Sequence, residues 1–169
     1  MARETLLDKA YEGLTQRVGG DVIECGVGHG GSLGPLGQLI DAEGQGRALY
    51  GYDAFPGWTL EEANAASEAE WAQWGIHAVL HLVKGDFAQT LPARLPRAVS
   101  FGHVDCNSEE AHLIVLEAVW PRLSKGGVLF FDDWGEEKWP GVALAIDAFF
   151  HKRRDAQLNR EARVALKSG

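Results

Sequence analysis

Residues 24–32, which read Glu24-Cys-Gly26-Val-Gly28-His-Gly30-Gly-Ser32, lie between a short apolar run at 21–25 and a segment of helical apolar spacing at 33–42. The run before the glycines has the character of a strand, and the segment after them has that of a helix. Glycines let the backbone turn tightly and let a ligand come close to it. A strand, a glycine loop and a helix in this order indicate a ligand-binding α/β domain.

Outward from this loop, short apolar runs alternate with longer amphipathic segments, which predicts a Rossmann-like α/β fold: a doubly wound, mostly parallel sheet with helices on both faces. In such a sheet, ligands bind beyond the carboxyl ends of the strands. Pro35 fits the helix after the loop only in its first turn. The predicted strands are 21–25, 47–52, 79–83, 99–104 and 127–131, with a weak candidate at 162–167, and the predicted helices are 3–16, 33–42, 59–74, 109–123 and 141–152.

The length of 169 residues predicts one domain over 1–169. Sixteen basic and 24 acidic residues give a net charge of −8, and the only basic cluster is at 151–154, so neither a nucleic acid nor an anionic membrane surface is an expected partner. No apolar run approaches the ~18 residues that span a bilayer, and residues 1–14 lack the apolar core of a signal peptide. The two cysteines, Cys25 and Cys106, fit a reduced, cytoplasmic compartment.

Acidic side chains follow the predicted strands: Glu24, Asp53 and Asp105 end three of them, the pair at 132–133 ends the fifth, and Asp86 follows the third by two residues. Acids gathered on one edge of a sheet repel one another, which a fold tolerates when a cation or a hydroxyl-rich ligand lies between them. Asp53 lies at the end of the strand after the glycine loop, where a carboxylate accepts hydrogen bonds from ribose hydroxyls.

Two cofactors fit such a loop, a nicotinamide dinucleotide and S-adenosylmethionine. The dinucleotide fingerprint is G-x-G-x-x-G. The spacing here is G-x-G-x-G, with Glu24 two residues before the first glycine. This pattern resembles motif I of class I S-adenosylmethionine-dependent methyltransferases.

The resemblance extends over residues 20–150. The segments 51–57, 84–87, 103–105, 126–134 and 139–142 are similar to the macrocin-type (TylF-like) O-methyltransferases. The resemblance implies the class I methyltransferase fold and methyl transfer from S-adenosylmethionine to a hydroxyl of a small molecule such as a sugar, polyketide or phenol. It implies a cofactor site made of Glu24, Gly26, Gly28, Gly30, Ser32, Asp53, Ala54, Phe55, Asp86, Phe87 and Asp105.

The same resemblance implies a Mg²⁺ site made of Asp105, Asp132 and Asp133, with Asp105 and Asp132 as catalytic residues. The chemistry of the side chains agrees, because Mg²⁺ prefers a few carboxylate oxygens and keeps positions open for water or substrate. Consecutive side chains of an extended strand point in opposite directions. A loop must therefore begin at Asp132 if Asp132 and Asp133 are to bind the same ion.

The sequence also departs from the family pattern. Asn107 replaces an acid, Glu109 replaces an aromatic residue, and Ser108 stands where catechol-type enzymes place a catalytic lysine. The general base stays open between the metal, Asp105 and His29. Trp134 and Trp139 flank the predicted site as candidates for a substrate wall.

The N-terminal lid of larger relatives is mostly absent, and the C-terminal edge of the sheet is expected to be truncated. An uncovered edge predicts a homodimer. Two other functions remain open: a non-catalytic scaffold or subunit that binds S-adenosylmethionine and, less favoured, a nicotinamide-dependent oxidoreductase.

Overall fold

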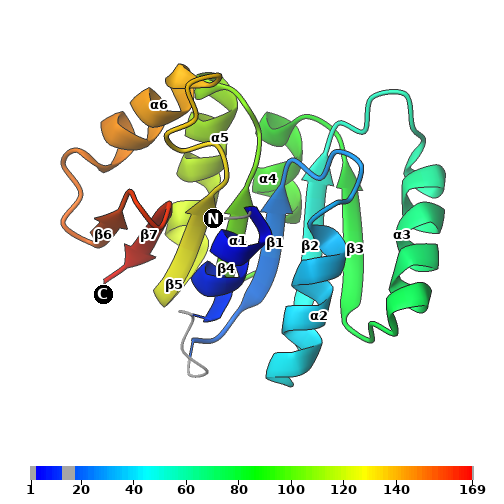
Figure 1. Cartoon of the computed structure of the whole chain (residues 1–169). Coiled ribbons are helices and arrows are strands. Elements are labelled where there is room, and N and C mark those ends of the chain that lie inside the picture. Colours follow the sequence, from blue (N-terminus) through cyan, green and yellow to red (C-terminus); the bar gives the residue numbers. More distant parts are fainter. Residues whose placement is uncertain (1–2, 13–17, 169) are drawn as a thin grey trace.

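The computed structural model describes residues 3–12 and 18–168, with side chains from residue 6 onward, and builds them into one seven-stranded sheet between two layers of helices (Figure 1). The helices are α1 (Arg3–Glu12), α2 (Leu33–Glu43), α3 (Leu60–Trp74), α4 (Phe87–Arg94), α5 (Glu109–Val119) and α6 (Pro140–Phe150), with a 3₁₀ turn, η1, at Trp120–Arg122. The strands are β1 (Asp21–Cys25), β2 (Ala48–Asp53), β3 (Val79–Lys84), β4 (Val99–Val104), β5 (Leu123–Phe131), β6 (Ala156–Asn159) and β7 (Val164–Lys167).

The strand order is β3-β2-β1-β4-β5-β7-β6. The first five strands of the chain pair in parallel, whereas β7 is antiparallel to both β5 and β6. The predicted mostly parallel, doubly wound sheet is confirmed. The chain reverses its direction across the sheet between β1 and β4, which places the carboxyl ends of these strands at the point where such folds bind ligands.

Both faces of the sheet are covered, and the strands alternate their side chains between the two layers. Val22 packs in a core with α1, α2 and α3, and the next residue, Ile23, packs in a second core with α4, α5 and α6. Figure 1 shows α1 and α2 in front of the sheet and α4 and α5 behind it. Burial on both faces explains why β4 is buried along its whole length.

The expectation of a truncated C-terminal edge is wrong, because β7 and β6 complete a seven-stranded sheet. The sequence of β6, Ala-Gln-Leu-Asn, is half polar, as suits a strand that lies at the edge and is largely exposed. The predicted homodimer therefore loses the truncation on which it was based, and it stays a prediction.

Two helices differ from the sequence-based expectation, and proline lies in both segments. The short helix α4 was not predicted, and it contains Pro92. The helix expected over 109–123 ends at Val119, because Pro121 turns the chain into η1. By contrast, Pro35 lies in the first turn of α2 as expected, and Thr59 and Glu62 form a capping box at the start of α3. Residues 13–16 of the first expected helix lie outside the described part of the chain.

No helix in the described part of the chain combines the length and the apolar character that crossing a membrane requires. Cys25 is buried, Cys106 is partly buried, and both are free thiols.

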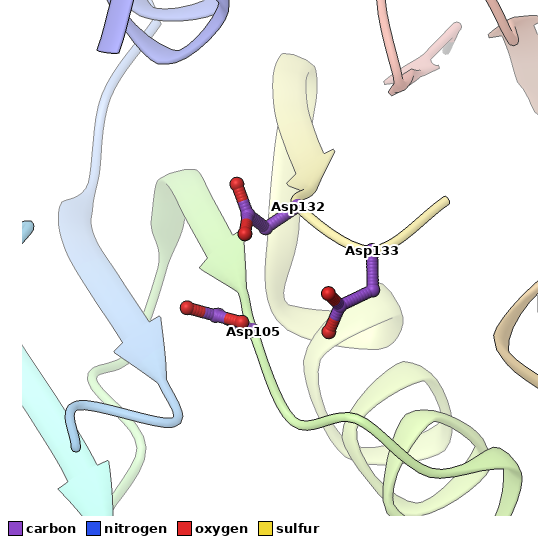
Figure 2. A group of neighbouring side chains, drawn as sticks. All are labelled: Asp105, Asp132 and Asp133. Carbon is purple, nitrogen blue, oxygen red and sulfur yellow. The ribbon is translucent and has the colours of Figure 1, made fainter. Parts of the chain in front are cut away.

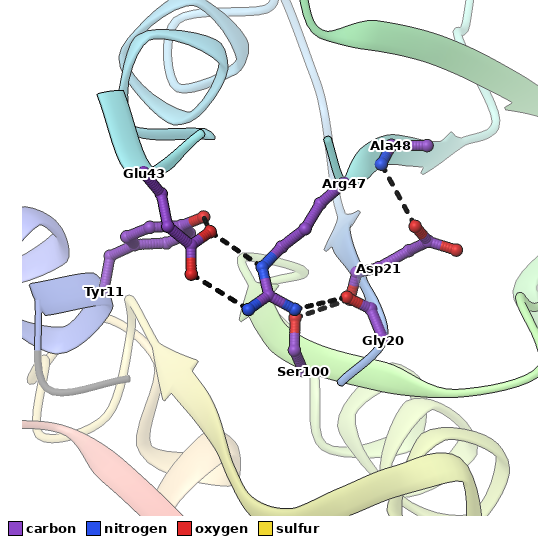
Figure 3. A network of polar contacts seen from close by, with 7 residues as sticks. All are labelled: Tyr11, Gly20, Asp21, Glu43, Arg47, Ala48 and Ser100. Atoms are coloured by element: carbon purple, nitrogen blue, oxygen red, sulfur yellow. Dashed lines mark hydrogen bonds and ion pairs between the residues drawn. The ribbon is translucent and has the colours of Figure 1, made fainter. Parts of the chain in front are cut away.

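A buried ion pair holds α1 and α2 to the start of the sheet (Figure 3). The Glu43 carboxylate accepts hydrogen bonds from the Tyr11 hydroxyl at 2.9 Å and from Nε and Nη2 of Arg47 at 2.7 and 2.9 Å. Nη1 of Arg47 donates to the carbonyl of Gly20 at 2.6 Å, just before β1. The two side chains of the pair are only 5% and 9% exposed. Removal of one partner would leave the other charge buried.

We expect Glu43→Gln to lower the free energy of unfolding at pH 7 by about 3 kcal/mol, because Arg47 would lose its counter-charge. The hydrogen bond from Arg47 is the main reason why the pKa of Glu43 lies below its ordinary value of 4.5. The stabilisation by this lowered pKa is present above about pH 4.5 and is lost as the pH falls through the folded-state pKa.

Urea unfolding of wild type and Glu43→Gln should therefore differ at pH 7 and converge at low pH, where Glu43 is protonated in both states of the wild type. Glu68→Gln, at an exposed position of α3, is the control and should change little at either pH. An equal difference between Glu43→Gln and wild type at both pH values would contradict the assigned role of the Glu43 charge.

Candidate active site

A cavity of about 590 Å³ opens beyond the carboxyl ends of β1, β2, β4 and β5. This is the edge of the sheet at which the sequence places its glycine loop and most of its acidic strand ends. The lining residues are Leu7, Gly26, Val27, Gly28, His29, Gly31, Ser32, Pro35, Asp53, His103, Asp105, Asn107 and Asp132.

Gly26 allows the loop to touch β4. Its φ of 98° lies in the region that favours glycine, and a Cβ atom there would lie 1.8 Å from the carbonyl oxygen of Asp105. Its amide donates to the carbonyl of Tyr52 at 2.9 Å. The loop is thus fixed between the ends of β2 and β4, and the same contact brings Asp105 to the cavity.

Asp53 ends β2 and lines the cavity from the side opposite Asp105. One carboxylate oxygen accepts from the amide of Gly28 at 2.9 Å, and the other accepts from the amide of Phe55 at 2.6 Å. Lys84 Nζ donates to the carbonyls of Phe55 and Trp58 and so fastens the turn after Asp53. Each carboxylate oxygen has a second lone pair, so Asp53 keeps acceptor capacity for a ligand hydroxyl.

Glu24 lies beneath the loop and is fully buried. Its Oε1 atom accepts from the Ser32 hydroxyl at 2.6 Å and lies 2.9 Å from Nδ1 of His103. The network links the loop to β4, and it uses the Ser32 hydroxyl for this link instead of for capping α2.

His103, in β4, also lines the cavity. Within the described part of the chain, its buried Nε2 atom has no hydrogen-bond partner. Burial disfavours the charged imidazole, but Glu24, Asp105 and Asp132 outweigh this effect and raise the pKa of His103 above its ordinary value. A buried carboxylate therefore orients this histidine at the wall of the cavity.

Three carboxylates meet at the other side of the cavity (Figure 2). Asp105 follows β4, and Asp132 and Asp133 form the turn that follows β5. One oxygen from each carboxylate lies within 4.8 Å of the others. The strand ends at Phe131 and the turn begins at Asp132, as binding by both aspartates requires. Three hard oxygen donors at this spacing suit Mg²⁺.

Arg163, in the turn just before the neighbouring strand β7, holds the turn after β5 in place. Its guanidinium donates to the carbonyl of Asp132 and, at 2.5 Å, to the carboxylate of Glu136. Sequence reasoning missed this residue, because nothing in the sequence around it shows that β7 returns antiparallel beside β5.

A second cavity, of about 300 Å³, lies on the far side of Asp132, which lines both cavities. Helix α1 contributes to both, because Leu7 lines the first and the adjacent Leu6 lines the second. Helix α1 thus forms part of the wall of both cavities. The other lining residues of the second cavity are Asp132, Asp133, Glu136, Lys138, Trp139 and Arg163.

The structure places the predicted site residues in three groups. Those that line the first cavity are Gly26, Gly28, Ser32, Asp53, Asp105 and Asp132. Three lie close to it, Glu24 bonded to Ser32 of the loop and both Gly30 and Phe55 in a small adjoining hollow, and Asp133 lines the second cavity. Ala54, Phe55, Asp86 and Phe87 line neither of these two cavities.

Local structure explains some of these placements. Asp86 caps α4 by accepting from the amide of Ala88 at 2.8 Å, and Phe55 is buried in the core. Trp134 is buried against Phe131, so only Trp139 of the two predicted wall residues reaches a cavity. Asn107 and His29, both noted in the sequence, line the first cavity.

Cys106 lies beside the acidic cluster, with Sγ 3.3 Å from Nδ1 of His112. Burial, together with the charges of Asp105 and Asp133, raises the pKa of the Cys106 thiol. Burial also lowers the pKa of His112, so this imidazole is neutral at neutral pH. The pair is therefore a protonated thiol beside a neutral imidazole, which is not an activated nucleophile.

Comparison with known proteins identifies a matching family. A family model described as a methyltransferase domain matches residues 23–134, which run from β1 to the turn after β5 and include the glycine loop and all three aspartates. No curated protein matches the sequence.

Solved structures share the fold over almost the whole chain. The O-methyltransferase NovP has a TM-score of 0.75 at 18% identity, with 98% of this chain and 79% of that chain covered. CalS11, a TDP-rhamnose 3′-O-methyltransferase of calicheamicin biosynthesis, has a TM-score of 0.74 at 25% identity over the same shares. The S-adenosylhomocysteine-bound methyltransferase PaMTH1 of Podospora anserina has a TM-score of 0.66 at 15% identity, with 97% and 76% covered.

Proposed function

Since the chain belongs to the family of S-adenosylmethionine-dependent methyltransferase domains, we propose that it transfers a methyl group to a hydroxyl of a small molecule with the help of Mg²⁺. The observation that carries this proposal is the position of Asp132. Its carboxylate belongs to a three-carboxylate cluster and lines both the cavity of the glycine loop and the second cavity beyond it. An ion at this cluster would lie between a cofactor and an acceptor.

The first cavity suits S-adenosylmethionine in size and in chemistry. Its volume of about 590 Å³ lies within the range of small-molecule sites, roughly 300–1,000 Å³. Asp53 keeps acceptor capacity for ribose hydroxyls, and Gly28, where a Cβ atom would meet nothing within 4 Å, leaves the backbone open to close approach.

The acidic cluster suits Mg²⁺ because all three donors are carboxylates. The bound ion would lower the pKa of an acceptor hydroxyl and orient it toward the methyl donor. The backbone holds the donors in place: the amide of Asp132 donates to the carbonyl of Val104 at 3.1 Å, and the amide of Asp105 donates to the carbonyl of Cys25 at 2.8 Å. The sequence resemblance to macrocin-type O-methyltransferases supports the choice of oxygen as the methylated atom.

Ser108, at the position of the catalytic lysine of catechol-type enzymes, caps α5 by accepting from the amide of Ala111 at 3.2 Å. The proton acceptor must therefore come from elsewhere. His29 and Asp105 both line the first cavity. We favour His29, because Asp105 is assigned to the metal.

We expect the protein to bind S-adenosylhomocysteine but not NAD in calorimetric titrations with and without Mg²⁺, because the glycine spacing differs from the dinucleotide fingerprint. Detection of methyl transfer to a hydroxylated acceptor then separates an enzyme from a scaffold that only binds the cofactor. Binding of NAD alone would overturn the proposed function.

In the same titration, Asp53→Ala should weaken S-adenosylhomocysteine binding at least tenfold. Hydrogen bonds to charged groups contribute about 1.5–3 kcal/mol each, and 1.4 kcal/mol is a factor of ten. Asp53→Asn keeps one acceptor oxygen and should lose less affinity for S-adenosylhomocysteine than Asp53→Ala. Asp147→Asn, on the exposed face of α6, should keep the affinity of the wild type. Unchanged affinity in Asp53→Ala would remove this residue from the site.

A further inference from the structure

The second cavity combines an aromatic wall with an exposed cation beside the acidic cluster. Trp139 and, from α1, Leu6 give it two apolar walls. Its volume of about 300 Å³ is at the small end of the range for ligand sites. An aromatic face next to a metal site suits a six-membered ring, whether aromatic or a sugar, because such a ring stacks on indole while its edge hydroxyls reach the ion.

The two cations that line this cavity, Arg163 and Lys138, have different partners. Arg163 is engaged with the carboxylate of Glu136 at 2.5 Å and with the carbonyl of Asp132. Lys138 Nζ lies over the Trp139 ring at 4.7 Å from its centroid. Among the described residues, the Lys138 ammonium has this ring as its partner and forms no ion pair with a carboxylate.

We propose that the second cavity binds the methyl acceptor and selects a hydroxylated ring that carries an anionic substituent, a carboxylate or a phosphate. The ring would stack on Trp139, its hydroxyl would face the acidic cluster, and its anionic group would pair with Lys138. This inference rests on the proposed function, because the hydroxyl is assigned to a metal at Asp105, Asp132 and Asp133.

The acidic residues of the cavity do not oppose such an acceptor. Glu136 is neutralised by Arg163, and Asp132 and Asp133 face the proposed cation. Lys138 is exposed, and exposed ion pairs contribute at most about 1 kcal/mol. We therefore expect a preference of about fivefold for the anionic form over its neutral counterpart, and a weaker preference at high salt because of screening.

Two matched pairs of probes test the inference on the full chain with S-adenosylhomocysteine and Mg²⁺ present: 3,4-dihydroxybenzoate against catechol, and glucose 6-phosphate against glucose. Calorimetry should show about fivefold tighter binding of the anionic member in at least one pair, which also distinguishes an aromatic acid from a sugar phosphate. Lys138→Met should abolish the preference without weakening the neutral member. Lys138→Arg should keep it, and Lys125→Met, near the opposite end of β5, should leave it unchanged.

Equal affinity for both members of each pair, binding of neither pair, or a preference that persists in Lys138→Met would overturn the inference. Each of these results leaves the proposed function standing if S-adenosylhomocysteine binds and Mg²⁺ raises the melting temperature. Failure of the wild type to bind S-adenosylhomocysteine would instead overturn both.

Discussion

Replacement of Gly26 by alanine is expected to weaken S-adenosylhomocysteine binding by at least a hundredfold and to lower the melting temperature sharply. The new Cβ atom would lie 1.8 Å from the carbonyl oxygen of Asp105, and φ at this position is 98°. The backbone of Asp105 cannot rotate away as a flexible side chain could, so the loop must move away from β4. That movement would disturb the cofactor cavity and the position of Asp105 together.

Gly75→Ala is a matched control for the backbone conformation. Gly75 ends α3 with a φ of 64°, and a Cβ atom there would meet nothing within 4 Å. The variant should lose only about 1–2 kcal/mol of stability and keep its affinity for S-adenosylhomocysteine. If Gly26→Ala kept both its melting temperature and its affinity, the close contact between the loop and β4 would not be required.

The glycine loop and the acidic cluster were predictable because both depend on short segments. The loop is contiguous in the sequence, and parallel strands place their carboxyl ends at the same edge of a sheet. Asp105 and Asp132 are 27 residues apart, yet each directly follows a strand that the sequence indicates clearly. The proximity of these two carboxylates could therefore be predicted from the ends of the two strands alone.

The second cavity was not predictable in the same way. Its two cations are Lys138, in the turn after β5, and Arg163, just before β7. They lie in the same cavity only because β7 pairs antiparallel with β5, and the sequence indicates β7 only weakly. Leu6 and Leu7 were expected on one helix, but the docking of α1 decides which cavity each one lines. The local sequence does not indicate such long-range packing.

Asp86 carries a local signal that the sequence analysis did not use. The resemblance assigns Asp86 and Phe87 to the cofactor, and in the structure Asp86 is also the N-cap of α4. Aspartate is among the preferred N-cap residues, so the helix that begins at Phe87 could have been predicted from it.

We expect Asp132→Asn to lower the rate of methyl transfer about a thousandfold while S-adenosylhomocysteine binding stays within about threefold of wild type. Metal catalysis contributes several kcal/mol, and about 4 kcal/mol corresponds to a thousandfold. The substitution removes charge from the cluster but leaves the backbone of residue 132, which bonds Val104 and Arg163, in place. The cofactor contacts assigned to Asp53 and the glycine loop lie on the other side of the cavity.

A second readout tests the cation without an acceptor. Mg²⁺ at a hundred times its dissociation constant should stabilise the wild type by about 2.7 kcal/mol, which raises its melting temperature, whereas Asp132→Asn should not respond. Chelation by EDTA should reduce wild-type transfer to the level of the variant, and added Mg²⁺ should restore it. Asp147→Asn, which breaks only the exposed pair with Arg160, should behave as wild type in every arm. Full activity in EDTA, together with a melting temperature indifferent to Mg²⁺, would show that the three aspartates do not hold a catalytic metal.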